Sequence, residues 1–147
     1  MTLYLRLGRI GKYYAMIIVL DTCSYIWNSS ERNLLSPAAR DAINEANKVG
    51  ELIYSDITLW EIALLKNKNR LRIEFDLQIY FEVTLAMYNY RKQEITPEIA
   101  ECGATLPPEI NHDPADRIIA ATSIVLQAPL ITADKNLRKS KLIKTIW

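Results

Sequence analysis

HDPADRIIAATSIVLQAPLITAD, residues 112–134, is the stretch around which the rest of the chain is arranged. It begins with Asp113 and Pro114, an N-cap residue followed by proline at the first helical position, which predicts the start of a helix. The body of this helix is almost wholly apolar, so we expect it to be buried. Pro129 ends it, and the apolar residues beyond predict a short buried strand that leads to Asp134. Carboxylates therefore stand at the helix start and at the strand end.

The composition sets limits on the class of protein. A chain of 147 residues is expected to form one domain, and half of its residues are hydrophobic, enough for a sizeable core. The net charge of +1 gives no global field that favours nucleic acid, so any basic surface is local. Cys23 and Cys102 show neither metal-ligand spacing nor a disulfide framework, and we expect a reducing, cytoplasmic location. No apolar run approaches the ~20 residues that a membrane helix needs.

Residues 1–15 differ from the rest of the chain. They carry Arg6, Arg9 and Lys12 and no acid, which leaves residues 16–147 with a net charge of −2. They lack the uninterrupted apolar region of a secretory signal. We expect an N-terminal extension here, as an edge strand, a frayed terminus or a segment ahead of a start at Met16. The domain proper is expected to comprise residues 16–147.

Apolar strands and helices alternate along the remainder. Strands are predicted at 16–20, 52–54, 94–96, 130–132 and 142–147, and helices at 22–27, 36–49, 59–69, 76–90, 97–102, 113–126 and 136–141. A loop is expected at residues 29–35. Short, β-branched strands that alternate with helices favour an α/β fold around a parallel sheet.

Acidic residues recur at the ends of these predicted strands. Ligands of parallel sheets bind outside the carboxyl ends of the strands, and Asp21 and Asp134 directly follow such ends. Glu61 lies in the first turns of the helix after the second strand, at the same edge. Asp116 reaches this edge if the preceding connection crosses back to it. Carboxylates that lie close together repel one another, so we expect a cation among them. A site of oxygen ligands without His or Cys suits Mg²⁺ or Mn²⁺.

Each carboxylate also has a purely structural interpretation. Thr58 and Glu61 match the spacing of a capping box. Asp113 suits an N-cap, and with Arg117 it has the spacing of an i,i+4 ion pair. Asp134 is placed to cap the turn that follows it. Only the joint arrangement favours a site.

Four segments together resemble the PIN domain nucleases, and within them the toxins of the VapC kind. They are VLDT (19–22), SDITLWEI (55–62), HDPADRIIAAT (112–122) and LITADKN (130–136). Their order and spacing make the resemblance fairly specific, and it covers residues 16–147. It implies a three-layer α/β/α sandwich with a central parallel sheet.

The resemblance also implies a site, an activity and partners. Carried over residue by residue, the acidic site comprises Asp21, Glu61, Asp116 and Asp134, with Asp113 as a supporting neighbour and Thr132 as a hydroxyl near Asp134. The implied activity is hydrolysis of RNA phosphodiesters with one or two Mg²⁺ or Mn²⁺ ions, by the toxin of a type II toxin-antitoxin pair. The implied partners are the RNA substrate, a VapB-type antitoxin and a second copy in a homodimer.

Several features stay open from the sequence. His112, the only histidine, is a weak candidate for a general base, and Cys23 has no visible base to activate its thiol. The basic runs at 66–72 and 135–141 either follow an RNA backbone or are solvated surface. The alternatives are a non-catalytic PIN-like module that binds RNA or protein, and a structure-specific DNA nuclease. The sequence holds no phosphate-binding glycine loop, which excludes an NTPase.

Overall fold

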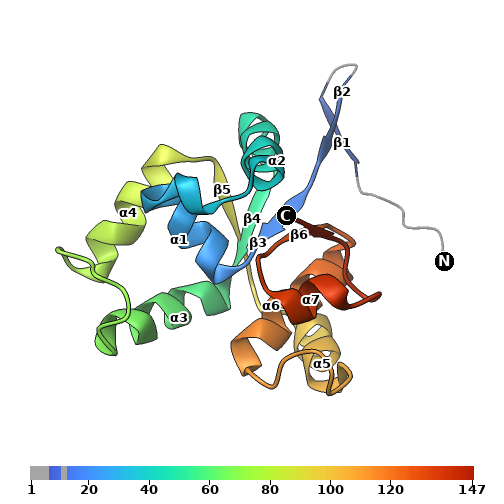
Figure 1. The fold of residues 1–147 in the computed structure, drawn as a ribbon. Coiled ribbons are helices and arrows are strands. Elements are labelled where there is room, and N and C mark those ends of the chain that lie inside the picture. Colours follow the sequence, from blue (N-terminus) through green and yellow to red (C-terminus); the bar gives the residue numbers. More distant parts are fainter. Residues whose placement is uncertain (1–6, 11–12) are drawn as a thin grey trace.

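The computed structural model describes residues 7–10 and 13–147, with side chains described from Met16 onward. Its centre is a parallel sheet of five strands in the order β5-β4-β3-β6-β7 (Figure 1). The strands are β3 (Ile18–Leu20), β4 (Leu52–Ser55), β5 (Tyr90–Gln93), β6 (Leu130–Ile131) and β7 (Thr145–Ile146). In the central strand, Val19 lies opposite Ile53 of β4 and opposite Leu130 of β6.

Helices cover both faces of this sheet. They are α1 (Thr22–Ser30), α2 (Pro37–Lys48), α3 (Asp56–Asn67), α4 (Leu77–Met87), α5 (Pro97–Thr105), α6 (Pro114–Leu126) and α7 (Lys135–Lys139), with a 3₁₀ turn at Arg32–Leu34. Strand side chains alternate between faces, so Ile18 and Leu20 join a core with α1 to α4, whereas Val19 joins a second core with α5 to α7. The expected three-layer α/β/α sandwich is confirmed.

The N-terminal segment contains a hairpin of its own. β1 (Leu7–Ile10) pairs antiparallel with β2 (Tyr13–Met16) in a separate two-stranded sheet. The rest of the segment for which we expected an extension, residues 1–6 and 11–12, lies outside the described residues. The division at Met16 into an extension and a domain therefore stays a prediction.

One strand lies earlier in the chain than its sequence pattern suggested. The strand expected at 94–96 is at 90–93, and the helix expected to reach Tyr90 ends at Met87. The reason is tertiary: the ring of Tyr90 packs 4.7 Å from that of Tyr25 and 5.9 Å from that of Tyr54, and its backbone pairs with β4. Packing of this aromatic residue overrides the helical periodicity before it.

Smaller differences concern helix ends. α3 begins at Asp56, three residues before the expected start, because the hydroxyl of Ser55 accepts a hydrogen bond from the Ile57 amide at 3.3 Å and so forms the N-cap. The loop expected at 29–35 holds the end of α1 and the 3₁₀ turn. No helix within residues 7–10 and 13–147 is long and apolar enough to cross a membrane.

Candidate metal centre

Two carboxylates cap helices at the carboxyl edge of neighbouring strands. Asp21 follows β3 and accepts a hydrogen bond from the Ser24 amide at 2.8 Å, which makes it the N-cap of α1. Asp134 follows β6 and accepts from the Asn136 and Leu137 amides at 2.8 and 2.9 Å, which makes it the N-cap of α7. Because β3 and β6 are paired in parallel, the two acids lie at the same edge, as expected.

Glu61 reaches this edge from α3 and is held by a hydroxyl of α1. Thr22 donates a hydrogen bond to the carboxylate of Glu61 at 2.5 Å, and its hydroxyl also lies 3.2 Å from that of Thr58. The capping-box interpretation of Thr58 and Glu61 is wrong, since Ser55 caps α3 and Thr58 is buried inside the helix. The carboxylate of Glu61 thus has no role in starting its own helix.

The start of α6 completes the acidic group. Asp113 caps this helix, accepting from the Ala115 and Asp116 amides at 2.8 and 3.3 Å. One carboxylate oxygen each from Glu61, Asp113 and Asp116 lie within 4.8 Å of one another. Asp113, expected as a neighbour that supports the site and as a further candidate metal ligand, is a member of this acidic group, which we call the carboxylate triad.

Asn111 connects the carboxylate triad to the end of β6. Its Nδ2 donates hydrogen bonds to Oδ2 of Asp116 and to Oδ2 of Asp134, both at 3.0 Å, and its Oδ1 accepts from Asn136 at 2.9 Å. Sequence reasoning missed this residue because a single Asn in a connection carries no signal of its own. The bridge shows that Asp116 and Asp134 share one site.

Arg117 fixes the connection that places Asn111. Its guanidinium donates to five backbone carbonyls, that of Gly103 in α5 and those of Leu106, Pro107, Ile110 and Asn111 in the connection to α6. The expected ion pair between Asp113 and Arg117 is absent from the ion pairs of the described chain. The rigid fork of an arginine suits this role, since its five N–H groups can serve several acceptors at once.

The electrostatics of the edge reflect crowded, partly buried acids. Burial, reinforced by the charges of Asp116, Asp113 and Asp21, raises the pKa of Glu61 to about 7 despite the hydrogen bond from Thr22. Burial, reinforced by neighbouring aspartates, raises the pKa of Asp116 to about 6 against the hydrogen bond from Asn111. The pKa of Asp21 is raised as well, mainly by burial, while hydrogen bonds with Thr132 and Ser24 oppose the shift.

The charges of these acids also affect the pKa of the Cys23 thiol. Its pKa is raised to about 12, first by desolvation and then by the charges of Asp21, Glu61, Asp116 and Asp134. The charges of all four acids predicted from the sequence thus reach one sulfur atom. A raised pKa disfavours the thiolate, the form in which a cysteine acts as a nucleophile. His112 is exposed and lies outside the carboxylate triad.

This donor set fits a divalent cation. The ion pairs found among the described residues join Lys48 to Glu45, Arg72 to Glu74, Arg91 to Glu51 and Lys92 to Asp56, so none of them neutralises an acid of the edge. Carboxylate oxygens without a protein cation nearby favour a hard metal ion, which would remove the repulsion that raises their pKa values. Glu61, Asp113 and Asp116 form the group best placed to hold such an ion.

Comparisons with known proteins agree with this geometry. The PIN domain model matches residues 18–141. Ribonuclease VapC22 of Mycobacterium tuberculosis (strain ATCC 25618 / H37Rv) is 33% identical over 132 residues, which cover 88% of this chain and 98% of that protein.

Two solved structures share the fold. VapBC2 from Rickettsia felis, bound to a DNA fragment from its promoter, aligns with a TM-score of 0.66 at 16% identity over 88% of this chain and 97% of the other. A toxin-antitoxin complex from Klebsiella pneumoniae aligns with a TM-score of 0.60 at 22% identity over 86% and 94%. At these identities the two structures support the architecture.

Proposed function

The chain belongs to the PIN domain family, and from this membership we propose that it is a metal-dependent endoribonuclease of the VapC type, the toxin of a type II toxin-antitoxin pair. The observation that carries the proposal is the gathering of five carboxylates at one sheet edge with no protein cation paired to them within the described chain. A protein that only bound RNA would gain nothing from such a group, because these charges repel a phosphate backbone unless a metal ion neutralises them. Hydrolysis uses them, because they hold the ion that the reaction needs.

We assign Mg²⁺ or Mn²⁺ to this edge. Glu61, Asp113 and Asp116 would hold the ion, with Asp21 and Asp134 completing the site. A divalent ion, when bound, lowers the pKa of water and stabilises charge on the leaving oxygen of the phosphodiester.

The protein's own groups supply orientation. Asn111 holds the carboxylates of Asp116 and Asp134 in one arrangement, and Thr22 does the same for Glu61. Such hydrogen-bonded support is what keeps ligating carboxylates in place. The raised pKa of Glu61, about 7, leaves this carboxylate only part-ionised near neutral pH until the cation binds. The site is therefore ordered before the ion and substrate arrive, and its charge state depends on the ion.

The proposal extends to partners. The two solved relatives are described as a VapBC pair and a toxin-antitoxin complex, and we propose a VapB-type antitoxin and a homodimer for this chain as well. The exposed apolar residues of α4, Ile79, Val83, Leu85 and Met87, give these partners a surface to cover. RNA as substrate places the active protein in the cytoplasm.

The test is cleavage of total and structured RNAs by the purified protein with Mg²⁺, with Mn²⁺ and with EDTA, beside the Asp21→Asn variant. We expect cleavage that requires a divalent ion and is lost in Asp21→Asn. Cleavage that survives both EDTA and the substitution would contradict the assignment of the site. Light scattering after size-exclusion chromatography tests the homodimer, and a clean monomer would count against it.

A further inference from the structure

A basic hollow is formed at α7, the helix that Asp134 caps. Lys135, Arg138 and Lys139 of α7 line it together with Thr145 and Trp147, and its volume is about 410 Å³. Leu137 of the same helix is buried, so the three cations share the outer surface of α7. We call these five lining residues the α7 pocket. No acid lines it.

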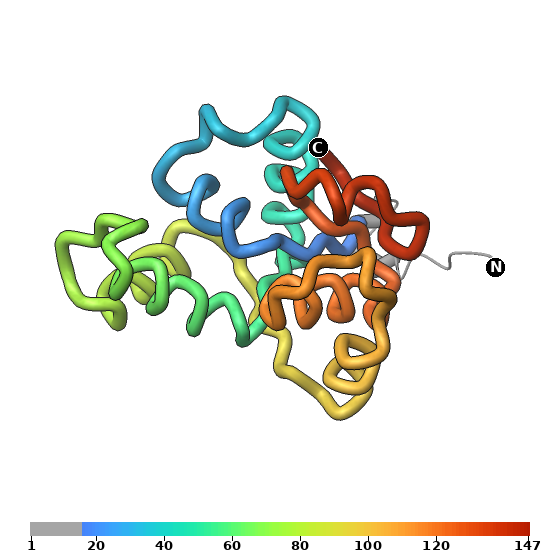
Figure 2. The backbone as a smooth tube through the Cα atoms, turned by 60° about the horizontal axis from the view of Figure 1, so that its bottom comes forward, coloured from blue at the N-terminus to red at the C-terminus, as the bar shows by residue number. Residues whose placement is uncertain are grey.

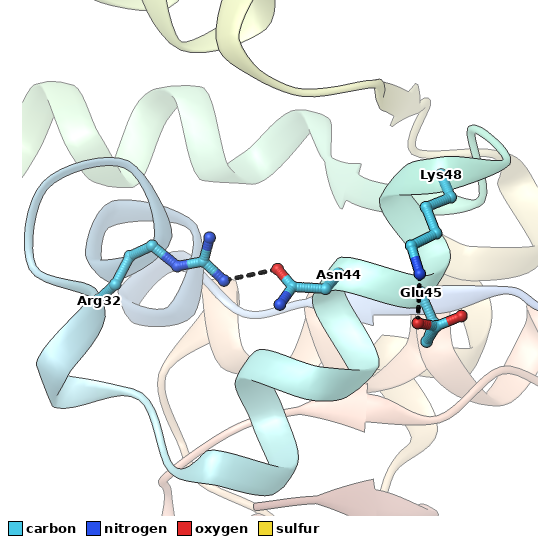
Figure 3. Close-up of polar contacts among 4 residues, drawn as sticks. All are labelled: Arg32, Asn44, Glu45 and Lys48. Carbon is cyan, nitrogen blue, oxygen red and sulfur yellow. Dashed lines mark hydrogen bonds and ion pairs between the residues drawn. The ribbon is translucent and has the colours of Figure 1, made fainter.

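The three cations of this pocket have no ion-pair or side-chain hydrogen-bond partner within the described chain, unlike Lys48 and Arg32. On the surface of α2, Lys48 pairs with Glu45 at 2.7 Å and Arg32 donates to Asn44 at 2.7 Å (Figure 3). The ion pairs and side-chain hydrogen bonds of the described residues include none from the three cations of α7. Three neighbouring positive charges that pair with no carboxylate among the described residues attract an anion.

Trp147 adds an aromatic wall to the same pocket. Its ring lies 5.9 Å from that of Trp27, with an angle of 52° between the planes, and it packs against the core of the α1 side. This contact holds the indole in place while part of it lines the hollow. Cations beside a fixed aromatic ring are the combination that binds single-stranded nucleic acid, phosphates on the charges and a base on the ring.

The pocket lies next to the acidic edge rather than elsewhere on the molecule. Asp134 is the N-cap of α7, and this helix of five residues is only about 7 Å long. β7, which leads to Trp147, pairs in parallel with β6, which leads to Asp134. The other basic run, 66–72, lies at the opposite end of the molecule, between α3 and α4 (Figures 1 and 2). Of the two runs, that of α7 directly follows an acid of the edge, because Asp134 is the residue before Lys135.

We propose that the α7 pocket binds a nucleotide of single-stranded RNA that flanks the cleaved bond. The cations of α7 contact its phosphates, and the base stacks on Trp147. This inference rests on the proposed nuclease function, and it names the route that the substrate follows away from the metal centre.

The first test measures RNA binding in the cleavage-deficient Asp116→Asn protein with Mg²⁺. Labelled single strands of about ten nucleotides, of uridine, adenosine or cytidine, serve as probes. Changing Lys135, Arg138 and Lys139 together to Gln is expected to raise Kd about tenfold and to reduce the slope of log Kd against log salt by about 2, since each lost phosphate contact contributes ~0.7. The matched control changes Arg32, Arg40 and Lys48 of the α2 side to Gln, with the same loss of charge.

The second test isolates the indole. Trp60 is changed to Phe, and Trp27, whose ring packs against Trp147, is kept, so the signal of Trp147 is the part of the fluorescence that a further Trp147→Phe change removes. RNA is expected to quench its fluorescence, whereas heparin, a polyanion without bases, is expected to bind without quenching.

The proposed role of the α7 pocket would be contradicted if the Asp116→Asn protein bound none of the RNA strands. It would also be contradicted if RNA bound but the two triple variants had equal salt slopes and the fluorescence of Trp147 was not quenched. Metal-dependent cleavage by the wild type would still uphold the nuclease in either case. Absence of that cleavage, with RNA bound and quenching seen, would instead contradict the nuclease.

Discussion

The carboxyl edge of the sheet and the seam between α1 and α4 are both rich in polar side chains, yet they are stabilised in opposite ways. In the seam, the hydroxyl of Tyr25 lies 2.6 Å from that of Thr84, and Asn28 donates to the hydroxyl of Tyr90 at 2.8 Å. These groups are neutral and pair with one another. Among the buried side-chain atoms of the described chain, only Oδ1 of Asn28 lacks a partner.

At the edge, by contrast, the polar groups are acids that repel one another. Asn111 and Thr22 hold three of them in place without neutralising their charge. The seam is thus close to complete within the protein, whereas the edge lacks a positive charge. A polar cluster that is well ordered but not neutralised identifies a place where a ligand belongs.

The largest effect that separates the two regions is expected from Asp116→Asn. Loss of this charge should reduce RNA cleavage about 10³-fold, because the triad then loses a ligand to the ion. The free energy of unfolding in EDTA should stay equal or rise, since a repulsive charge is removed. Cleavage rates and urea unfolding measure the two effects, with the exposed Asp41→Asn of α2 as the control. If the Asp116→Asn variant cleaves RNA as fast as the wild-type protein, the proposed difference between the edge and the seam is wrong.

The pH dependence of stability should come from the edge. The pKa values of Glu61, about 7, and Asp116, about 6, are higher in the folded protein than in the unfolded chain. The folded state therefore binds more protons between about pH 4 and pH 7, and its free energy of unfolding in EDTA should fall across this range. The fall is on the order of a few kcal/mol for the two groups together.

Mg²⁺ should restore the stability that is lost at the upper end of this range. Urea unfolding at several pH values, with and without the ion, measures both changes. Glu61→Gln should flatten the profile, and a matched seam variant, Tyr25→Phe, should leave its slope unchanged. A wild-type profile in EDTA that rises toward pH 7 would contradict the raised pKa values.

Arg117→Lys tests how the edge is held. A lysine ammonium cannot serve the five carbonyls that the guanidinium contacts, so several buried acceptors lose their donor. We expect the free energy of unfolding to fall by about 2–3 kcal/mol, with lower cleavage because Asn111 is displaced. If urea unfolding of the variant matches the wild type, the connection is held by other contacts.

The smallest effect is expected in the seam. Tyr25→Phe removes the hydrogen bond to Thr84 but keeps the ring that packs against Tyr54 and Tyr90. The loss should be about 1 kcal/mol in urea unfolding, with cleavage unchanged. A loss of cleavage in this variant would mean that the seam and the edge are coupled.

Local signals predicted most of the edge. Asp113 with Pro114 marks a helix start whatever surrounds it, and Asp21 and Asp134 follow apolar runs that only a buried strand explains. The shared position of these acids follows from the parallel sheet alone. This is why a parallel α/β fold with Asp21 and Asp134 at one edge could be predicted without any knowledge of contacts, whereas the full set of four acids came from the resemblance to the PIN domain nucleases.

What the sequence could not predict depends on contacts between distant residues. Asn111 bridges to Asp134 across 23 positions, and Thr22 donates to Glu61 across 39 positions. Tyr90 belongs to a strand because of the rings around it, although the residues before it are helical. Arg117 has the spacing of an ion pair with Asp113 but serves carbonyls, and no local pattern distinguishes the two outcomes.

The strand order has a consequence for synthesis of the protein. The central strand β3 comes from residues 18–20, but one of its two neighbours, β6, and the acid that follows it come from residues 130–134, far later in the chain. A nascent chain that has emerged from the ribosome only as far as α5 has an open sheet edge and lacks the start of α6 as well. The proposed site is therefore incomplete in a nascent chain until residues 113–134 have been made, whatever has folded before them.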